Sequence, residues 1–179
     1  MGWFARFELG FGGRGLLENN RILSDIGYPG FKWWAGFDGA YRVHPRVSVG
    51  GFIGMNRRSA APEEPTPSLN AYSVYGGAQA PIHLWGRRAY TFQFTPQVGL
   101  LGGTVSSSRP TFNRDDDDAG RAQFTAIFGG RLSFQSFTYH VGASAGLLFA
   151  PVGGPGEAGA PHDFGGLFLA LNATLDGDD

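Results

Sequence analysis

The chain has 179 residues, a formal net charge of -1 and no cysteine. This charge gives no reason to expect a nucleic-acid partner, and the lack of cysteine excludes both a disulfide framework and a thiolate metal site. Charged residues make up only 16% of the chain, whereas a soluble domain usually carries about 25%. No run of about 18 apolar residues is present, which excludes a transmembrane helix. The length fits one domain over residues 1–179.

Apolar and polar residues alternate along the chain in a way that predicts eight β-strands. In chain order, the predicted strands cover about residues 3–13, 31–43, 46–56, 70–85, 89–104, 122–134, 137–149 and 164–175. Pro96 lies on the apolar face of the fifth strand and cannot donate a ladder hydrogen bond, so we expect a bulge there. No segment predicts a long amphipathic helix.

The connections between these strands alternate between short and long. Short turns are expected at residues 44–45, 86–88 and 135–136, and long polar loops at 15–30, 57–69, 105–121 and 150–163. Short turns at one end and long loops at the other are typical of a transmembrane barrel. An even number of antiparallel strands then places both termini at the end with the short turns.

Two closed barrels fit the alternation, and they differ in which face meets the solvent. A soluble, lipocalin-like barrel points its apolar face inward around a ligand, whereas a membrane barrel turns that face to lipid. The central part of the apolar face carries no Asp, Glu, Lys or Arg, and a charge facing lipid near the bilayer midplane costs roughly 2–4 kcal/mol. The polar face is rich in small residues, which suit the narrow interior of an eight-stranded barrel. Most Trp and Tyr residues lie near strand ends, where aromatic girdles occur. Trp85 has the opposite parity, so we expect it to belong to a turn.

The sequence therefore predicts an all-β fold, an eight-stranded antiparallel up-and-down transmembrane β-barrel. In this fold Trp33, Phe37 and Tyr41 face lipid, while Asp38 and Arg42 face the lumen.

This pattern resembles that of the small eight-stranded outer-membrane β-barrel proteins, such as the OmpA transmembrane domain, OmpX and OmpW. The resemblance covers nearly the whole chain. It implies a bacterial outer-membrane location, with the lipid bilayer and lipopolysaccharide as partners. The first residues, MGWFARFELG, lack the basic start and apolar core of a secretory signal. The chain is therefore either cytoplasmic or a mature form restarted at an added Met1, and the resemblance implies the mature form, with its signal removed. We also expect a monomer without a cofactor.

Several ionisable residues lie on the lumen face of the predicted strands. The candidates for a lumen charge network are Arg6, Glu8, Asp38, Arg42, Arg131 and His140. Because a buried charge must be paired, we expect these side chains to form ion pairs that plug the lumen. A narrow channel, in which the same pairs exchange partners, is the alternative. The resemblance to OmpA implies a lumen network of this kind, without fixing any position.

An acidic run lies in the third long loop. Asp115, Asp116, Asp117 and Asp118 most simply form a solvated loop tip. A sharper hypothesis is a weak divalent-cation site that bridges to lipopolysaccharide phosphates or to a partner surface. The run lacks the spaced ligands of an EF-hand loop.

One residue pair raises the question of catalysis. His140 and Ser144 share a face and resemble the His and Ser of outer-membrane lipid A deacylases. Four residues along a strand span about 13 Å, however, whereas a nucleophile and its base must lie within about 3 Å. The leading prediction is therefore a non-enzymatic protein, structural or surface-binding through its four long loops. The alternatives are a narrow channel for ions or small solutes and a soluble carrier of an apolar ligand.

Overall fold

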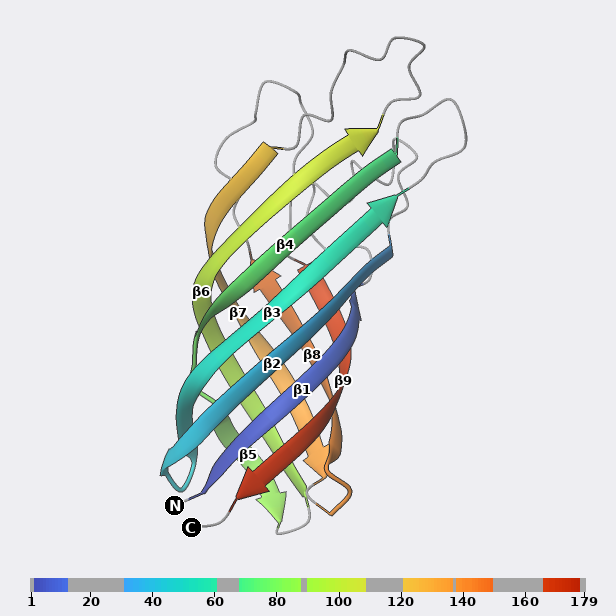
Figure 1. Cartoon of the computed structure of the whole chain (residues 1–179). Coiled ribbons are helices and arrows are strands. Elements are labelled where there is room, and N and C mark those ends of the chain that lie inside the picture. The colour runs from blue at the N-terminus through green and yellow to red at the C-terminus, as the bar shows by residue number, and fades with distance from the viewer. Residues whose placement is uncertain are drawn as a thin grey trace.

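The computed structural model describes residues 2–12, 31–60, 68–87, 90–108, 121–136, 138–149 and 166–177. Its strands are β1 (Trp3–Gly12), β2 (Phe31–His44), β3 (Val47–Ala60), β4 (Ser68–Gln79), β5 (Ile82–Arg87), β6 (Tyr90–Ser108), β7 (Arg121–Ser136), β8 (Val141–Phe149) and β9 (Gly166–Gly177). All pairings are antiparallel, and β1 pairs with both β2 and β9, so the sheet closes into a barrel (Figure 1). Over these residues, no helix is long and apolar enough to cross a membrane.

The segments β4 and β5 are two halves of one barrel strand, which is interrupted at Ala80 and Pro81. Gln79 pairs with Gln97 and Ile82 pairs with Phe94, so β6 keeps one register across the break. The nine segments therefore form eight barrel strands, and the predicted fold class is confirmed.

The bulge predicted at Pro96 is wrong in its position. Pro96 pairs with Gly130 in the β6–β7 ladder, and its carbonyl accepts a hydrogen bond from the N–H of Ala80. Because the N–H and C=O of one strand residue point the same way, the missing N–H of Pro96 faces the break between β4 and β5. The register shifts instead between His83 and Trp85, where β5 carries one extra residue, as in a β-bulge.

The two faces of the barrel carry opposite kinds of side chain, as the alternation predicts. Phe37 is 53% exposed and Leu171 is 70% exposed on the outside, whereas Arg6 and Gln93 are 0% exposed inside. A soluble barrel requires the reverse arrangement, so the interpretation as a soluble carrier is wrong. The bulge also explains Trp85: because β5 carries an extra residue, Leu84 and Trp85 both face outward, 54% and 59% exposed.

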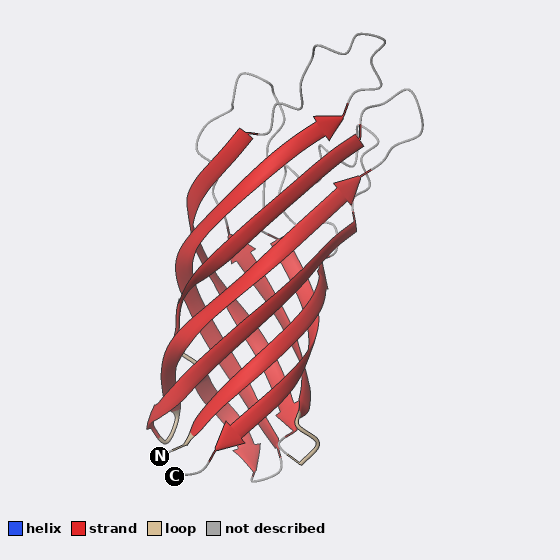
Figure 2. Ribbon diagram, in the orientation of Figure 1, coloured by secondary structure: helices blue, strands red, loops and turns tan. Residues whose placement is uncertain are grey.

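The barrel wall is uneven in height (Figure 2). β6 has 19 residues and β8 has 9. On the tall side the strands run further toward the loops than predicted, so that residues 57–60 belong to β3 and 105–108 to β6. On the low side β8 begins at Val141 rather than at 137, because His140 takes a left-handed conformation with φ of 51° in the preceding turn.

Candidate functional site

Four charged side chains meet in the barrel lumen: Arg6 and Glu8 from β1, Asp38 from β2 and Arg131 from β7. None of the four is more than 3% exposed. Arg6 Nη2 lies 2.6 Å from Asp38 Oδ2, and Arg6 Nε lies 3.2 Å from Glu8 Oε1. Arg131 Nη1 lies 2.6 Å from Glu8 Oε2, and Arg131 Nη2 contacts Asp38. Each arginine thus pairs with both carboxylates, and this lumen quartet has no net charge.

The sheet register explains why the quartet forms. Arg6 and Asp38 are direct cross-strand partners, and Glu8 follows Arg6 on the same face. Arg131 projects from the opposite wall and completes the quartet from β7. Such pairing is required at this depth, because leaving one buried charge without its partner costs about 3–5 kcal/mol.

Three neutral side chains from other strands also bond to the quartet. Gln79 Oε1 accepts a hydrogen bond from Arg131 at 3.3 Å, and Ser133 Oγ accepts one from Arg6 at 3.4 Å. Ser144 Oγ donates to Glu8 at 3.3 Å. The quartet therefore links β1 and β2 to β4, β7 and β8 across the lumen.

A second group of lumen side chains is apolar. This apolar lumen cluster contains Trp34, Phe52, Tyr75, Leu101, Ile127 and Ala170, with Leu148 and Phe168 packed against it. Trp34 precedes Asp38, and Ile127 precedes Arg131, on strands that run from the loop end to the turn end, so the cluster extends toward the loops. Trp34 and Phe168 meet edge to face at 4.9 Å between ring centroids.

Glycines on neighbouring strands make room for the large rings. A Cβ at Gly10 would overlap Trp34 Nε1, and a Cβ at Gly54 would lie 2.5 Å from Tyr75 Oη. The rings therefore lie directly against the backbone of β1 and β3.

On the turn side of the quartet the lumen is polar again. His83 Nε2 lies 3.3 Å from Ser48 Oγ, and Gln93 Nε2 lies 3.3 Å from His83 Nδ1. Gln135 donates to Thr174. From the turns to the loops the lumen is thus mainly polar, then charged at the lumen quartet, then mainly apolar, with buried Asn56 and Ser73 on the loop side of the apolar lumen cluster.

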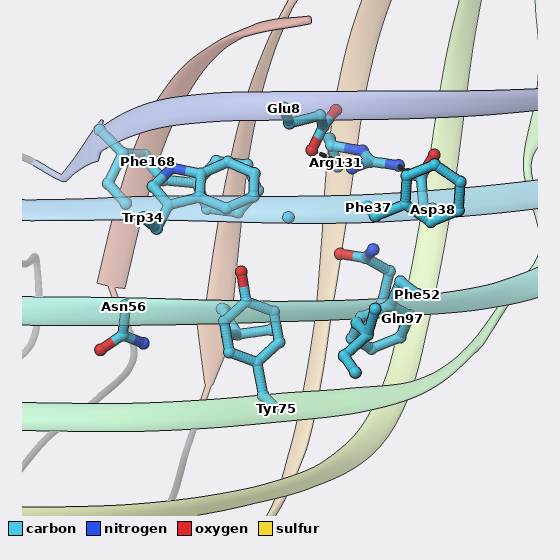
Figure 3. Close-up of a pocket in the computed structure, with 14 residues that line it drawn as sticks. Glu8, Trp34, Phe37, Asp38, Phe52, Asn56, Tyr75, Gln97, Arg131 and Phe168 are labelled. Carbon is cyan, nitrogen blue, oxygen red and sulfur yellow. Dashed lines mark hydrogen bonds and ion pairs between the residues drawn. The ribbon is translucent and has the colours of Figure 1, made fainter. Parts of the chain in front are cut away.

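A cavity lies between the quartet and the apolar cluster (Figure 3). Glu8 and Arg131 lie at one end and Trp34 with Phe168 at the other, while Tyr75 points toward the space between them. Its volume is about 40 Å³, which is room for very few water molecules. Arg131 Nε, in the wall, has no hydrogen-bond partner among the described residues.

The structure brings together four of the six residues predicted to form the network. Arg42 is exposed near the β2–β3 turn, where its backbone N–H bonds Gly2 O. His140 is 57% exposed in the β7–β8 turn, and its Nδ1 lies 3.5 Å from Asp176 Oδ1. The prediction that Arg42 and His140 share the network is therefore wrong, because alternation gives the face of a side chain but not its height in the lumen.

Other sequence predictions are not tested or were incomplete. Asp115, Asp116, Asp117 and Asp118 lie outside the described residues, and within the described ranges no three His, Cys, Asp or Glu side chains group as metal ligands. The apolar lumen cluster was missed as a unit. Its signal in the sequence was a set of large apolar residues at lumen parity: Phe52, Tyr75, Ile127 and Phe168.

Comparison with known proteins adds fold likeness alone. No protein-family model matches the chain, and no curated protein matches it. Among solved structures it is similar to Ail, the attachment invasion locus protein of Yersinia pestis, in complex with the heparin analogue sucrose octasulfate, with a TM-score of 0.56, 9% identity and 97% of each chain covered. It is also similar to neisserial surface protein A, with a TM-score of 0.51, 13% identity, and 98% of this chain and 95% of that chain covered.

The fold is that of a small outer-membrane β-barrel. The predicted resemblance to this group is confirmed at the level of fold. In an outer-membrane barrel the exposed apolar side chains of the outer face contact lipid, and the lumen quartet lies at membrane depth.

Proposed function

We propose that the protein is a monomeric, non-enzymatic barrel of the bacterial outer membrane, closed to solutes, which acts at the cell surface through its four long loops. The observation that carries this proposal is the lumen quartet, four buried charges that bond one another across the barrel. The apolar lumen cluster beside it supports closure, because ions do not cross a dry apolar constriction readily.

The loops are the part of the chain left to meet partners. In this proposal the outer face contacts lipid, and the lumen side chains contact one another. The strands are connected at the external end by residues 13–30, 61–67, 109–120 and 150–165. These four segments contain four Arg and ten Asp or Glu. Such a balance favours a cationic partner, or an anionic one bridged by divalent cations at Asp115–Asp118, over direct binding of a sulfated sugar.

The arrangement of His140 and Ser144 supports a non-enzymatic role. Ser144 is buried in the lumen and bonds Glu8, whereas His140 is exposed in a turn beside Asp176. A hydrolase needs its nucleophile and base within hydrogen-bond reach.

Conductance tests the closed lumen. We expect no stable current steps when the refolded protein is inserted into planar lipid bilayers. The double variant Trp34→Ala with Phe168→Ala removes one edge of the apolar lumen cluster but leaves the lumen quartet in place, so it should not conduct either. A heat-dependent gel shift of protein recovered from the bilayer lipid controls for insertion. Stable steps from the unaltered protein would favour the second candidate function, a narrow channel. The cavity and the unpartnered Arg131 Nε are the observations that favour that candidate.

A further inference from the structure

One charged side chain breaks the apolar pattern of the outer face. At the outward positions of the strands, among residues whose side chains are described, Arg57 on β3 is the one ionised residue, and it is exposed. The structure gives the Arg57 side chain no hydrogen bond or ion pair with any described residue. A cation in this position needs a partner, since its neighbours on this face are the side chains that contact lipid.

Aromatic residues flank this arginine on both sides. In the sheet register Arg57 pairs with Trp33 of β2 and with Tyr72 of β4. Directly opposed residues on one face of a sheet have Cβ atoms about 4.5–5.5 Å apart, so the three side chains form one row across three strands. Tyr72 is 42% exposed and Trp33 is half-buried.

Polar residues first enter the outer face at this row. One outward position nearer the midplane, Met55 pairs with Ala35 and Val74. One position nearer the loops, Ser59 pairs with Asn70 and with the aromatic Phe31. Trp and Tyr mark the membrane–water interface in barrels.

The opposite boundary is marked by Tyr41, which pairs with Trp3 near the turns. At about 3.3 Å per residue and a strand tilt of about 40°, the stretch of β2 from Trp33 to Tyr41 rises about 20 Å. This is close to the apolar band of about 25 Å that outer-membrane barrels present to lipid. Arg57 therefore lies at the headgroup level of the external leaflet.

We propose that Arg57, with Trp33 and Tyr72 beside it, binds a phosphate group of lipopolysaccharide in the external leaflet. The inference rests on the proposed outer-membrane location. A guanidinium matches the geometry of a phosphate with paired N–H donors, and flanking aromatic rings pack against the sugar to which such a phosphate is attached. The contact is direct, so it differs from a cation bridge at Asp115–Asp118 and needs no divalent ion.

The test uses the refolded full chain in detergent micelles, with EDTA present to remove cation bridges. Native mass spectrometry measures the apparent dissociation constant for lipid A with both phosphates, for lipid A without phosphates, and for phosphatidylglycerol. The proteins are the unaltered chain, Arg57→Gln, Arg57→Lys and Arg42→Gln. Arg42 is the matched control, because it is also exposed but lies at the turn end of β2.

The loss of one charge-assisted, forked contact should weaken phosphorylated lipid A binding by about tenfold in Arg57→Gln. Arg57→Lys keeps the positive charge but lacks the paired N–H donors of a guanidinium, so its affinity for phosphorylated lipid A should fall by about threefold. Arg42→Gln should bind like the unaltered chain, and dephosphorylated lipid A should bind the unaltered chain as weakly as phosphorylated lipid A binds Arg57→Gln.

Three results would overturn the assignment. If the unaltered chain and Arg57→Gln bind phosphorylated lipid A equally well, Arg57 is not part of the site. If the unaltered chain binds dephosphorylated lipid A as tightly as phosphorylated lipid A, the phosphate is not what it recognises. If it binds phosphatidylglycerol as tightly, the site is not specific for lipopolysaccharide. A chain that does not refold in micelles at all would instead overturn the proposed membrane function, which a heat-dependent gel shift detects separately.

Discussion

Asp38 contacts both arginines of the lumen quartet, and its charge is what keeps the quartet neutral. In Asp38→Asn, Arg6 and Arg131 would share only Glu8, which leaves one buried positive charge. We expect the free energy of unfolding to fall by about 3–5 kcal/mol. Urea titration in lipid vesicles, followed by the gel mobility of the folded form, measures this loss. Arg42→Gln, a change at an exposed site, should stay within about 0.5 kcal/mol of the unaltered protein.

The quartet also allows a charge-balanced comparison. The double variant Arg131→Met with Glu8→Gln removes one charge of each sign and leaves Arg6 paired with Asp38. It should lose less stability than Arg131→Met alone, because replacing both partners of a buried pair avoids an uncompensated charge. Additive losses would contradict the pairing.

Gly54 provides a test of packing in the apolar lumen cluster. A Cβ at Gly54 would lie 2.5 Å from the Tyr75 hydroxyl, so Gly54→Ala should destabilise the barrel by about 1–3 kcal/mol through overpacking. At Gly39 the nearest atom to such a Cβ is Phe4 O at 3.4 Å, an ordinary contact, so Gly39→Ala is the matched control. Adding Tyr75→Val to Gly54→Ala should recover part of the loss. If Gly39→Ala costs as much in the same urea titration, the ring contact is not the cause.

At this scale, alternation predicted which side chains enter the lumen but not which of them meet. Arg6, Glu8, Asp38 and Arg131 come together because the tilt and register of strands far apart in sequence bring them to one height. Neither quantity can be read from a single strand. The prediction that His140 faces the lumen was wrong for a local reason: His140 is a left-handed turn residue, and strand alternation does not apply to it.

Among the strands, the half-strand β5 departs most from the expected pattern, because its bulge turns Trp85 to the outside. In a variant that keeps only Trp85, with the other tryptophans changed to Phe, brominated lipids should quench the fluorescence strongly. A variant that keeps only Trp34, which is 8% exposed and lies in the lumen, should resist both brominated lipids and aqueous acrylamide. Quenching of Trp34 but not Trp85 by lipid would reverse the assigned faces.

The eight barrel strands could be predicted because lipid imposes one strict rule on every second residue of each strand. Their ends could not be predicted as well. β3 continues to Ala60 and β6 to Ser108, beyond the apolar band, where apolar and polar residues no longer alternate along the sequence. The sequence also did not predict the interruption at Ala80–Pro81. The residues on either side of it pair with β6 in one unbroken register, so the alternation continues across the break.

For the whole molecule, the apolar outer face determines where folding can occur. Exposed side chains such as Ile53 at 58% and Phe124 at 75% would associate in water. The urea-unfolded chain should therefore gain β-type circular dichroism only when detergent or lipid is present. Its unheated form should migrate differently from its heated form on SDS gels. Equally good folding in plain buffer would contradict a membrane barrel.

The pairing of β1 with β9 has a kinetic consequence. Ten successive residues of the first strand pair with the last strand, and the bond from Arg131 to Glu8 joins positions 123 residues apart. Contacts of such long sequence separation slow folding, because a large loop must close before they form. A chain that lacks either end would retain two unsatisfied strand edges in an environment without water to solvate them. Ring closure is therefore expected to be the late, rate-limiting step of assembly, and the quartet should acquire its full set of partners only at that moment.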